Sequence, residues 1–353
     1  MTKDQTIEPS SHSENLSTFI NLGRLIDDGM IICASDGSII SANKPAFDLF
    51  EESLTGQRLQ DVLHSHEAQQ AVSDLGDALR PATFNYRHNN KVQREFQVRI
   101  GKINDGYFGV ILQDLTLRRN LEKVRRDFVA NVSHELRSPL TSLVGFVETM
   151  QTNPGLGPEQ AGKFLSIMDE EAKRMSRLID DLLSLSQVEV EEHIIPSEKV
   201  PVVQILNAVN DSLVARAASR DIKITLDDRR PAPNDRLIML GESDEITEVF
   251  HNLVENAVKY AFENSEIIVR LSQEDDRQFR VDVINHGEGI AAKHLPRLTE
   301  RFYRVDKARS RQMGGTGLGL AIVKHIVNRH RGVMHIRSDL GETTTFSVTF
   351  PAI

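Results

Sequence analysis

SHELRSPL, residues 133–140, lies at the centre of a long helical pattern. Apolar residues recur around it at spacings of three and four, as in an amphipathic helix: Leu121, Val124, Phe128, Val132, Leu136, Leu140, Leu143 and Val147. His134 and Ser138 are i,i+4 neighbours on a different, more polar face. Pro139 has no N–H to bond the Glu135 carbonyl, so the pattern predicts a helix that bends just beyond the histidine.

The residues beside this histidine suit phosphoryl transfer. An exposed imidazole next to a carboxylate can accept a phosphoryl group, because Glu135 can take a proton from one ring nitrogen of His134 while the other attacks. The ordinary alternative for a single histidine is a solvated helical side chain. The proline inside the helix and the second helix that follows weaken this alternative.

A second helix is predicted directly after the first. Turn residues at 151–157 (QTNPGLG) end the first helix, and Pro158 and Glu159 suit the first turn of the next. Its apolar residues have a/d-like spacing: Phe164, Met168, Met175, Leu178, Leu182 and Leu185. One helical hairpin cannot bury so much apolar surface by itself. Pairing two copies into a four-helix bundle would bury it, so the sequence predicts a homodimer.

The C-terminal part alternates strand and helix patterns, which predicts an α/β sandwich. The expected strands are Ile222–Leu226, Ile267–Leu271, Phe279–Ile284, Val333–Ile336 and Thr345–Phe350. Ser243 or Asp244 is expected to cap one helix, and a second helix is expected over Leu318–Arg329.

Asn252, Asn256 and Lys259 fall at i, i+4 and i+7, so they share one face of the first of these helices. Two amides and an ammonium suit a magnesium triphosphate, because an amide offers the metal a neutral oxygen and the ammonium offers phosphate a point charge. A polar outer helix face is an equally good interpretation of these three residues alone.

Two glycine-rich blocks follow. In VINHGEGI (283–290), glycines two apart let the backbone pass close to a ligand, and Asn285 stands at the strand end. GGTGLGL (314–320) runs directly into a helix, where free N–H groups and the helix dipole favour phosphate. It matches neither the P-loop nor the dinucleotide fingerprint. The preceding loop carries Arg304, Lys307, Arg309 and Arg311, and is either a mobile lid over a polyanion or a solvated basic loop.

The N-terminal part reads as a disordered tail, residues 1–16, and a small mixed domain. The domain's expected strands are Gly29–Ala34, Ser38–Ala42, Thr83–Tyr86, Phe96–Ile100 and Tyr107–Gln113, with a helix near Ala46–Phe50. Cys33 is expected to be a core thiol, and His64 and His66 to be solvated helical histidines. No cofactor is therefore predicted for this domain.

Composition excludes several classes of protein. The chain has 353 residues and a formal net charge of −9, with no Trp, so it lacks the basic face and stacking aromatics of a nucleic-acid binder. One cysteine excludes a disulfide framework. No run approaches the roughly 18 apolar residues of a transmembrane segment, and no secretory signal is visible. A cytoplasmic protein is expected, although a chain trimmed of an upstream membrane segment would look the same.

Together these blocks resemble two-component sensor histidine kinases. HELRSPL (134–140) is similar to that family's H box, RFYR (301–304) to its F box, and the asparagine and glycine blocks to its N, G1 and G2 boxes. The likeness covers about residues 117–353 and is nearest to phosphate-regulon-type sensor kinases. Residues 17–115 resemble a PAS domain. The expected organisation is a disordered N-terminus (1–16), a PAS sensor domain (17–116), a dimerisation and phosphotransfer hairpin (117–195) and a catalytic ATP-binding domain (196–353).

The resemblance implies an ATP-dependent protein histidine kinase. His134 would be phosphorylated from Mg·ATP with the assistance of Glu135, and would pass the group to an aspartate of a response regulator receiver domain. Ser138 would orient water if the same bundle hydrolyses that phosphoaspartate. Asn256 would hold Mg²⁺. The other nucleotide-binding residues implied are Asn252, Lys259, Tyr260, Asn285, Gly287, Gly289, Arg304, Gly315, Thr316, Gly317, Leu318, Gly319 and Thr344.

Three positions depart from the family pattern. Asn285 stands where the family usually has an aspartate that accepts from the adenine amino group; an amide oxygen still accepts that bond, but without charge assistance. Thr343 replaces a usual glycine, which would narrow the pocket edge. Ser138 replaces the commoner threonine and rotates more freely.

Two other functions stay open on these residues. A scaffold or phosphotransfer bundle with a degenerate ATP domain has the Asn285 exchange as its only support. A serine kinase or an ATP-driven clamp could use the same ATP fold, but His134 within a helical hairpin distinguishes the chain from both.

Overall fold

The computed structural model describes residues 20–50, 53–74, 80–89, 93–104, 106–153, 155–232, 237–275, 277–306 and 313–353. The chain forms two compact units, residues 1–127 and 128–353, which are described in turn. The tail predicted to be disordered, residues 1–16, lies outside the described residues.

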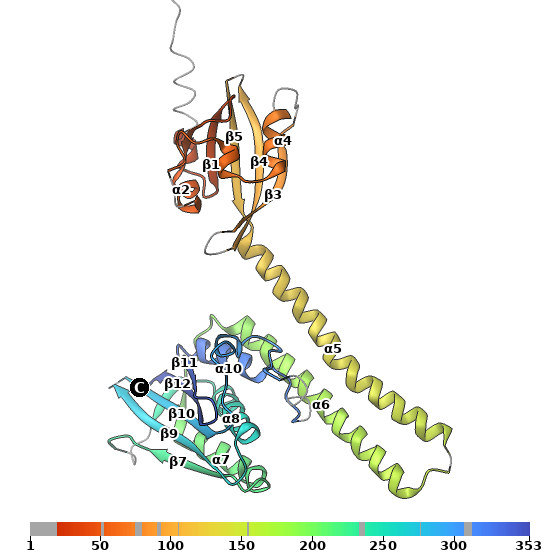
Figure 1. Ribbon diagram of the computed structural model, residues 1–353. Helices are drawn as coiled ribbons and strands as arrows, with labels where there is room; N and C mark the ends of the chain where they lie inside the picture. Colours follow the sequence, from red (N-terminus) through yellow and green to blue (C-terminus); the bar gives the residue numbers. More distant parts are fainter. Residues whose placement is uncertain are drawn as a thin grey trace, which may run out of the picture. The chain divides into compact units, whose positions relative to one another are not determined.

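The first unit contains an antiparallel sheet of five strands in the order β2-β1-β5-β4-β3 (Figure 1). The strands are β1 (Gly29–Ala34), β2 (Ile39–Ala42), β3 (Ala82–Asn89), β4 (Gln93–Asn104) and β5 (Tyr107–Asp114). Between β2 and β3 the chain forms α2 (Lys44–Phe50), α3 (Leu59–Val62) and α4 (His66–Ser73). The five predicted strands are confirmed. Helix α4 begins at His66, which was expected to be helical, whereas α3 was not expected from the pattern.

The core of this unit is built from alternate strand residues and contains Cys33, which is fully buried. Burial, together with the nearby charge of Asp36, raises the pKa of the Cys33 thiol to about 12. The thiol is therefore protonated at neutral pH and packs as a small apolar side chain, as predicted. His64 and His66 are both exposed, but His64 precedes α4 and is not helical as expected.

A helical hairpin connects to this unit. Helix α5 (Thr116–Thr152) begins in the first unit and continues in the second, where α6 (Pro158–Glu191) follows it. Pro158 is the first residue of α6, as the turn pattern predicts. Helix α5 continues through Pro139, whose side chain is buried. Within the described residues, neither these helices nor any other is long and apolar enough to span a membrane.

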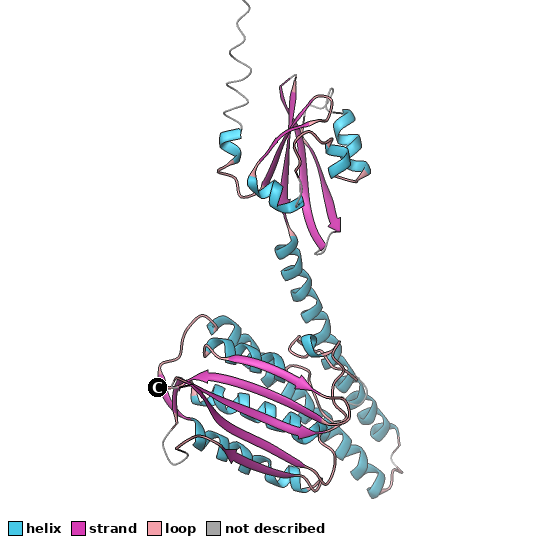
Figure 2. Cartoon of the chain, turned by 60° about the vertical axis from the view of Figure 1, so that its left-hand side comes forward, coloured by secondary structure: helices cyan, strands magenta, loops and turns pink. Residues whose placement is uncertain are grey.

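The rest of the second unit is an α/β sandwich, as predicted. A five-stranded sheet has the order β11-β12-β10-β9-β7, in which only the β7–β9 pair is parallel. Figure 2 shows helices on one side of this sheet. The elements are β6 (Glu198–Pro201), α7 (Val202–Ala218), β7 (Lys223–Asp228), β8 (Ile238–Gly241), α8 (Ser243–Tyr260), β9 (Glu266–Asp275), β10 (Gln278–His286), the 3₁₀ helix η2 (Leu295–Arg297), α10 (Gly319–Arg329), β11 (Val333–Ser338) and β12 (Thr343–Pro351).

The expected cap of α8 was wrong. Ser243 and Asp244 are already helical, Glu242 occupies the cap position, and no side chain caps the helix. The N–H of the cap residue Glu242 itself donates to Nε2 of His330 at 3.0 Å. Asp244 and Glu245 in the first turn complement the helix dipole instead.

Helix α6 packs against the sandwich through α10. Leu178, Leu185 and Val188 of α6 are buried in the same apolar cluster as Ile322 and Val323 of α10. Part of the apolar stripe that predicted a helical bundle is therefore covered within one chain. This packing brings the C-terminal half of α6 beside the sandwich.

Candidate functional site

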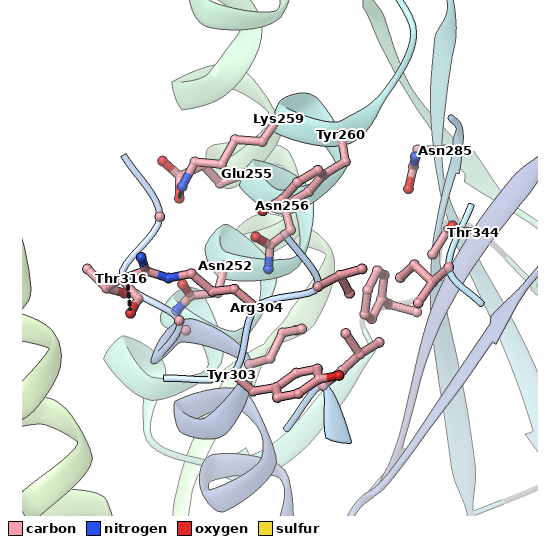
Figure 3. A pocket seen from close by; sticks show the side chains of 18 of the residues that line it. Asn252, Glu255, Asn256, Lys259, Tyr260, Asn285, Tyr303, Arg304, Thr316 and Thr344 are labelled. Atoms are coloured by element: carbon pink, nitrogen blue, oxygen red, sulfur yellow. Dashed lines mark hydrogen bonds and ion pairs between the residues drawn. The ribbon is translucent and has the colours of Figure 1, made fainter. Parts of the chain in front are cut away.

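A cavity of about 410 Å³ lies where α8, the end of β10, the glycine-rich segment 314–319 and helix α6 meet (Figure 3). All the expected nucleotide-binding residues except Leu318 line it. Asn285 and Thr344 lie at one end of the cavity, and Arg304 and Thr316 lie at the other. Residues from six separate segments of sequence are thus brought to one site.

Leu318 is the exception, because its side chain is fully buried in the apolar core and not exposed to the cavity. Its N–H donates a 3.2 Å hydrogen bond to Oγ1 of Thr316. Leu318 therefore anchors the glycine-rich segment to the core just before α10. The Leu318 side chain therefore does not face the cavity, and the assignment of Leu318 as a nucleotide-binding residue stays a prediction.

One face of α8 forms a wall of the cavity. Asn252, Asn256 and Lys259 all line it, as their spacing predicts. Lys259 Nζ donates to Glu255 Oε2 at 2.8 Å, and Arg216 pairs with the same carboxylate. Burial by itself would raise the pKa of Glu255, but the charges of Lys259 and Arg216 outweigh it and hold that pKa below its usual value. The ammonium is thus held in place by an ionised carboxylate.

Asn285 lies at the opposite end of the cavity and is only 3% exposed. It pairs with Thr344 across β10 and β12. The hydroxyl Oγ1 of Thr344 lies 2.7 Å from Oγ of Ser338. Thr343, expected to narrow the pocket edge, pairs with His286 in the same ladder and is not among the lining residues.

The two glycines after β10 are required by the backbone around them. A Cβ at Gly287 would stand 2.5 Å from the carbonyl oxygen of Tyr260. Gly289 has φ +73°, and a Cβ there would stand 2.5 Å from the carbonyl oxygen of Asp339. Both glycines line the cavity, so close backbone packing and access to a ligand favour the same residue type.

The glycine-rich segment has a similar constraint. Gly317 has φ +77°, and its carbonyl accepts a 2.8 Å hydrogen bond from the N–H of Phe302. A Cβ at Gly319 would stand 2.5 Å from Oδ1 of Asn252, so an alanine there would require the Asn252 side chain or the glycine-rich segment to shift. The start of α10 and the asparagine face of α8 are thereby placed on one cavity.

The predicted acceptor lies on α5. His134 and Ser138 are exposed, as expected. Glu135 is half-buried, and its Oε2 lies 3.1 Å from Arg174 Nη2 and 3.2 Å from Arg304 Nη2. The carboxylate expected to assist the histidine is therefore bound by two guanidinium groups, one from α6 and one from the nucleotide cavity.

Helix α6 contributes lining residues that no local motif indicated. Arg177 and Asp181 line the cavity, and Asp181 Oδ2 accepts a 2.6 Å hydrogen bond from Oγ1 of Thr316. Burial raises the pKa of Asp181, although the Thr316 hydroxyl and nearby cations oppose the shift. One turn further along α6, Ser184 donates to Glu248 of α8, at 2.8 Å to the nearer oxygen. The only signal in the sequence is the polar face of α6 at these positions.

The basic loop and the magnesium site are described only in part. Lys307, Arg309 and Arg311, named as a lid or a solvated loop, lie outside the described residues. Within the described ranges, no three His, Cys, Asp or Glu side chains gather as a metal site. The amide oxygen of Asn256 is a suitable hard donor for a magnesium ion that is also held by phosphate oxygens, which is how Mg²⁺ is commonly bound with nucleotides.

Three family models match the chain. Residues 241–353 match the "Histidine kinase-, DNA gyrase B-, and HSP90-like ATPase" model, residues 124–191 the "His Kinase A (phospho-acceptor) domain" and residues 27–117 the PAS domain. His134 lies in the matched phospho-acceptor region. The cavity is lined by residues of the matched ATPase region together with Arg177 and Asp181, which lie in the phospho-acceptor match.

Curated relatives agree with this. The chain is 36% identical over 326 residues to the phosphate regulon sensor protein PhoR of Pseudomonas aeruginosa. This match covers 92% of the chain and 72% of the relative. It is 32% identical to the sensor histidine kinase WalK of Bacillus subtilis, over 92% of the chain and 53% of the relative.

A solved structure has the same fold over most of the chain. The crystal structure of the histidine kinase ThkA in complex with the response regulator protein TrrA has a TM-score of 0.54 and 21% identity, covering 92% of this chain and 96% of that one. The chain belongs to the PAS-containing sensor histidine kinases of the PhoR type, ATP-dependent protein kinases that phosphorylate themselves on histidine and pass the phosphoryl group to a response regulator.

Proposed function

We propose that His134 accepts the γ-phosphoryl group of Mg·ATP bound in the cavity beside α8. The observation that supports this best is the contact between Arg304, which lines the cavity, and Glu135, which is adjacent to His134. A phosphate chain at the Arg304 end of the cavity would lie next to the acceptor helix.

The nucleotide is oriented by the two ends of the cavity. Asn285 and Thr344 offer a buried amide and a hydroxyl, which suit the polar edge of adenine. Lys259 and the N–H groups ahead of α10 suit the phosphates. Asn256, between these ends on α8, would hold Mg²⁺ through its amide oxygen, and the ion would neutralise phosphate charge.

The transfer is a displacement at phosphorus. The unprotonated ring nitrogen of His134 forms a bond to the γ-phosphorus, and the bond from that phosphorus to the bridging oxygen breaks, so that ADP leaves. Glu135 takes the proton from the other ring nitrogen. Because two guanidiniums hold Glu135 in this structure, it must be released from Arg304 first, and phosphates that compete for Arg304 would release it.

Ser138 supports a second activity on the same helix. It is exposed one turn beyond His134, on the same face of α5. A regulator phosphoaspartate docked against His134 would meet the Ser138 hydroxyl, which can orient a water molecule for attack. We include hydrolysis of the phosphorylated regulator in the proposed function for this reason.

The hairpin also supports a homodimer. Apolar side chains remain exposed on it after α6 has packed against α10: Leu140, Val144, Val147, Leu165, Ile179 and Leu183. Ile179 and Leu183 are i,i+4 neighbours, as are Leu140 and Val144, so each helix presents a continuous apolar face. A second copy would cover both faces in a four-helix bundle.

We place this reaction in the cytoplasm, where its substrate ATP is found, and attachment to a membrane through a segment outside this chain is compatible with that. The absence of a cofactor from the PAS unit stays a prediction. A visible absorption spectrum of the purified protein tests it, because haem or flavin would absorb.

Autophosphorylation of the purified chain tests the central proposal. Incubation with γ-³²P-ATP and Mg²⁺ is expected to give an acid-labile, base-stable label on wild-type protein and none on His134→Ala. His193→Ala, which changes a histidine beyond the end of α6, is the control and should label normally. Label that survives in His134→Ala would overturn the assignment of the acceptor.

A further inference from the structure

Arg177 brings a positive charge from the helical hairpin into the nucleotide cavity. It lies on α6, outside the matched ATPase region, yet lines the cavity. Its guanidinium faces the glycine-rich segment, where Nη1 and Nη2 lie 3.2 and 3.3 Å from the position that a Cβ of residue 314 would take. Arg177 and Gly314 therefore lie in direct contact.

The charge of Arg177 is less compensated than that of the cavity's other described cations. Lys259 pairs with Glu255, and Arg304 pairs with Glu135. Across the described ranges Arg177 forms no ion pair, and its Nε makes a long 3.4 Å hydrogen bond to the carbonyl of Lys173. A desolvated anion entering the cavity would gain most from a guanidinium that has no carboxylate to give up.

The buried carboxylate one turn beyond Arg177 on the same helix is already engaged. Asp181, one turn beyond Arg177, accepts its hydrogen bond from Thr316. The charge of Arg177 helps to keep Asp181 ionised, but it acts at a distance. The terminal nitrogens of Arg177 stay available beside the glycine-rich segment.

Along α6, Arg177 lies between the residue that contacts Glu135 and the residue that contacts Thr316. Arg174, three residues earlier, contacts Glu135 on α5. At a rise of about 1.5 Å per residue, Arg177 stands roughly 4.5 Å further along α6, toward the contact between Asp181 and Thr316. It is therefore placed between the glycine-rich segment and the level of the acceptor histidine.

We propose that Arg177 is a further phosphate-binding residue, contributed by helix α6, that contacts the γ-phosphate of ATP and stabilises its charge during transfer to His134. This inference rests on the proposed function. The planar guanidinium can bind two phosphate oxygens at once, and charge is spread over the equatorial oxygens while the phosphoryl group moves. ADP lacks the γ-phosphate, so Arg177 should distinguish the two nucleotides.

The test compares Arg177→Ala with Lys173→Ala in the full chain. Lys173 is one turn earlier on α6, is exposed, and pairs with Asp169, so its variant removes the same charge away from the cavity. Arg177→Ala is expected to lower the autophosphorylation rate at saturating ATP at least tenfold. It should also weaken ATP binding about tenfold while leaving ADP affinity within about twofold. Lys173→Ala should change neither, and Arg177→Lys should restore part of the rate.

The two failures can be told apart. An unchanged rate and an unchanged ratio of ATP to ADP affinity in Arg177→Ala would overturn the role of Arg177, even if His134 is labelled as proposed. Equal losses of ATP and ADP affinity would also overturn it, because they would show a general effect on the cavity. If wild-type protein is not labelled at His134, the proposed acceptor fails, and the ratio of nucleotide affinities still decides the role of Arg177.

Discussion

Arg304 and Glu135 form an ion pair that joins the nucleotide cavity to the acceptor helix, with Nη2 of the arginine 3.2 Å from Oε2 of the glutamate. The same guanidinium donates a 2.7 Å hydrogen bond to the carbonyl of Thr316. One side chain therefore connects the glycine-rich segment with the neighbour of His134. Phosphates in the cavity would compete with Glu135 for this arginine, so nucleotide binding would be coupled to the release of Glu135.

Glu135→Gln should separate catalysis from nucleotide binding. Glutamine has a similar shape but cannot accept the histidine proton, so the autophosphorylation rate should fall roughly 100-fold. ATP affinity should stay the same or improve slightly, because the phosphates would no longer compete with a charged side chain for Arg304. Rate measurements at saturating ATP and an ATP titration check the two effects. An unchanged rate would show that another group takes the proton.

Gly319→Ala tests the contact between α10 and α8. The new methyl group would stand 2.5 Å from Oδ1 of Asn252, so either that side chain or the glycine-rich segment must move. ATP affinity should fall at least tenfold. Gly162→Ala is the matched control, since it lies in α6 with nothing within 4 Å of the new Cβ. The control should bind ATP normally and gain up to about 1 kcal/mol of stability from helix propensity. Normal ATP binding by Gly319→Ala would contradict the geometry.

Local sequence patterns predicted the features that depend only on neighbouring residues, such as where a helix begins and which residues share one of its faces. The start of α6 at Pro158 and the shared face of Asn252, Asn256 and Lys259 follow from turn chemistry and from 3.6 residues per turn. The helix α7 (Val202–Ala218) has the same kind of apolar spacing, with Val202, Ile205, Leu206, Val209 and Leu213 buried.

Contacts between distant segments could not be predicted in this way. Arg177 and Asp181 reach the cavity only because α6 packs against α10, and no spacing within α6 indicates this. Leu318 shows that membership of a motif does not determine which way a side chain points. It lies among glycines that line the cavity, but the first turn of α10 rotates its side chain into the core. The ion pairs of Glu135 likewise depend on tertiary packing.

Asp181→Asn tests the hydrogen bond from Thr316 without its buried charge. The asparagine Oδ1 can still accept from the hydroxyl. Burial raises the pKa of Asp181, so the folded chain holds this proton more tightly than the unfolded chain, and the wild type loses stability as pH rises through that pKa. The variant should therefore be more stable than the wild type at pH 8, and this advantage should shrink as the pH falls and Asp181 becomes protonated.

Thermal unfolding of both proteins at a series of pH values up to pH 8 measures this difference. The exposed neighbour Asp180 provides the control, and Asp180→Asn should not change stability with pH in this way. A lower stability of Asp181→Asn at pH 8 would show that the ionised carboxylate is needed for the contact.

His330 should make the sandwich sensitive to acid. Its Nε2 accepts from the Glu242 N–H, and its Nδ1 donates to the Ile326 carbonyl at 2.9 Å, so the ring is neutral. Burial lowers the pKa of His330, and the charge of Arg329 lowers it further. The unfolded chain therefore binds the proton better, and stability is lost as pH falls below about 6.5, by at most about 1.4 kcal/mol per pH unit.

Denaturant unfolding of wild type and His330→Gln is measured between pH 5 and pH 8. The comparison separates the pH dependence of stability due to His330 from that due to Glu245, whose Oε2 lies 3.7 Å from Nδ1 of His330. The variant should be less stable at pH 8 but should lose less on acidification. His335→Gln, at an exposed position on β11, should keep the wild-type slope. An equal slope in wild type and His330→Gln would contradict the assignment of a neutral buried imidazole.

Asn285→Asp addresses the departure from the family pattern at the adenine end of the cavity. Asn285 is 3% exposed, so a carboxylate there would be desolvated and would gain most when a ligand donates a hydrogen bond to it. A charged acceptor makes a bond about twice as strong as a neutral one, so ATP affinity should rise about fivefold. The free protein should become less stable, because the carboxylate is then buried without that donor.

The rise in affinity should be equal for ATP, ADP and adenosine, since the new carboxylate acts on the base and not on the phosphates. Asn285→Leu removes the acceptor with little change in size and should weaken all three. If Asn285→Asp instead weakens ATP and ADP equally, the amide of Asn285 does not accept a hydrogen bond from the base.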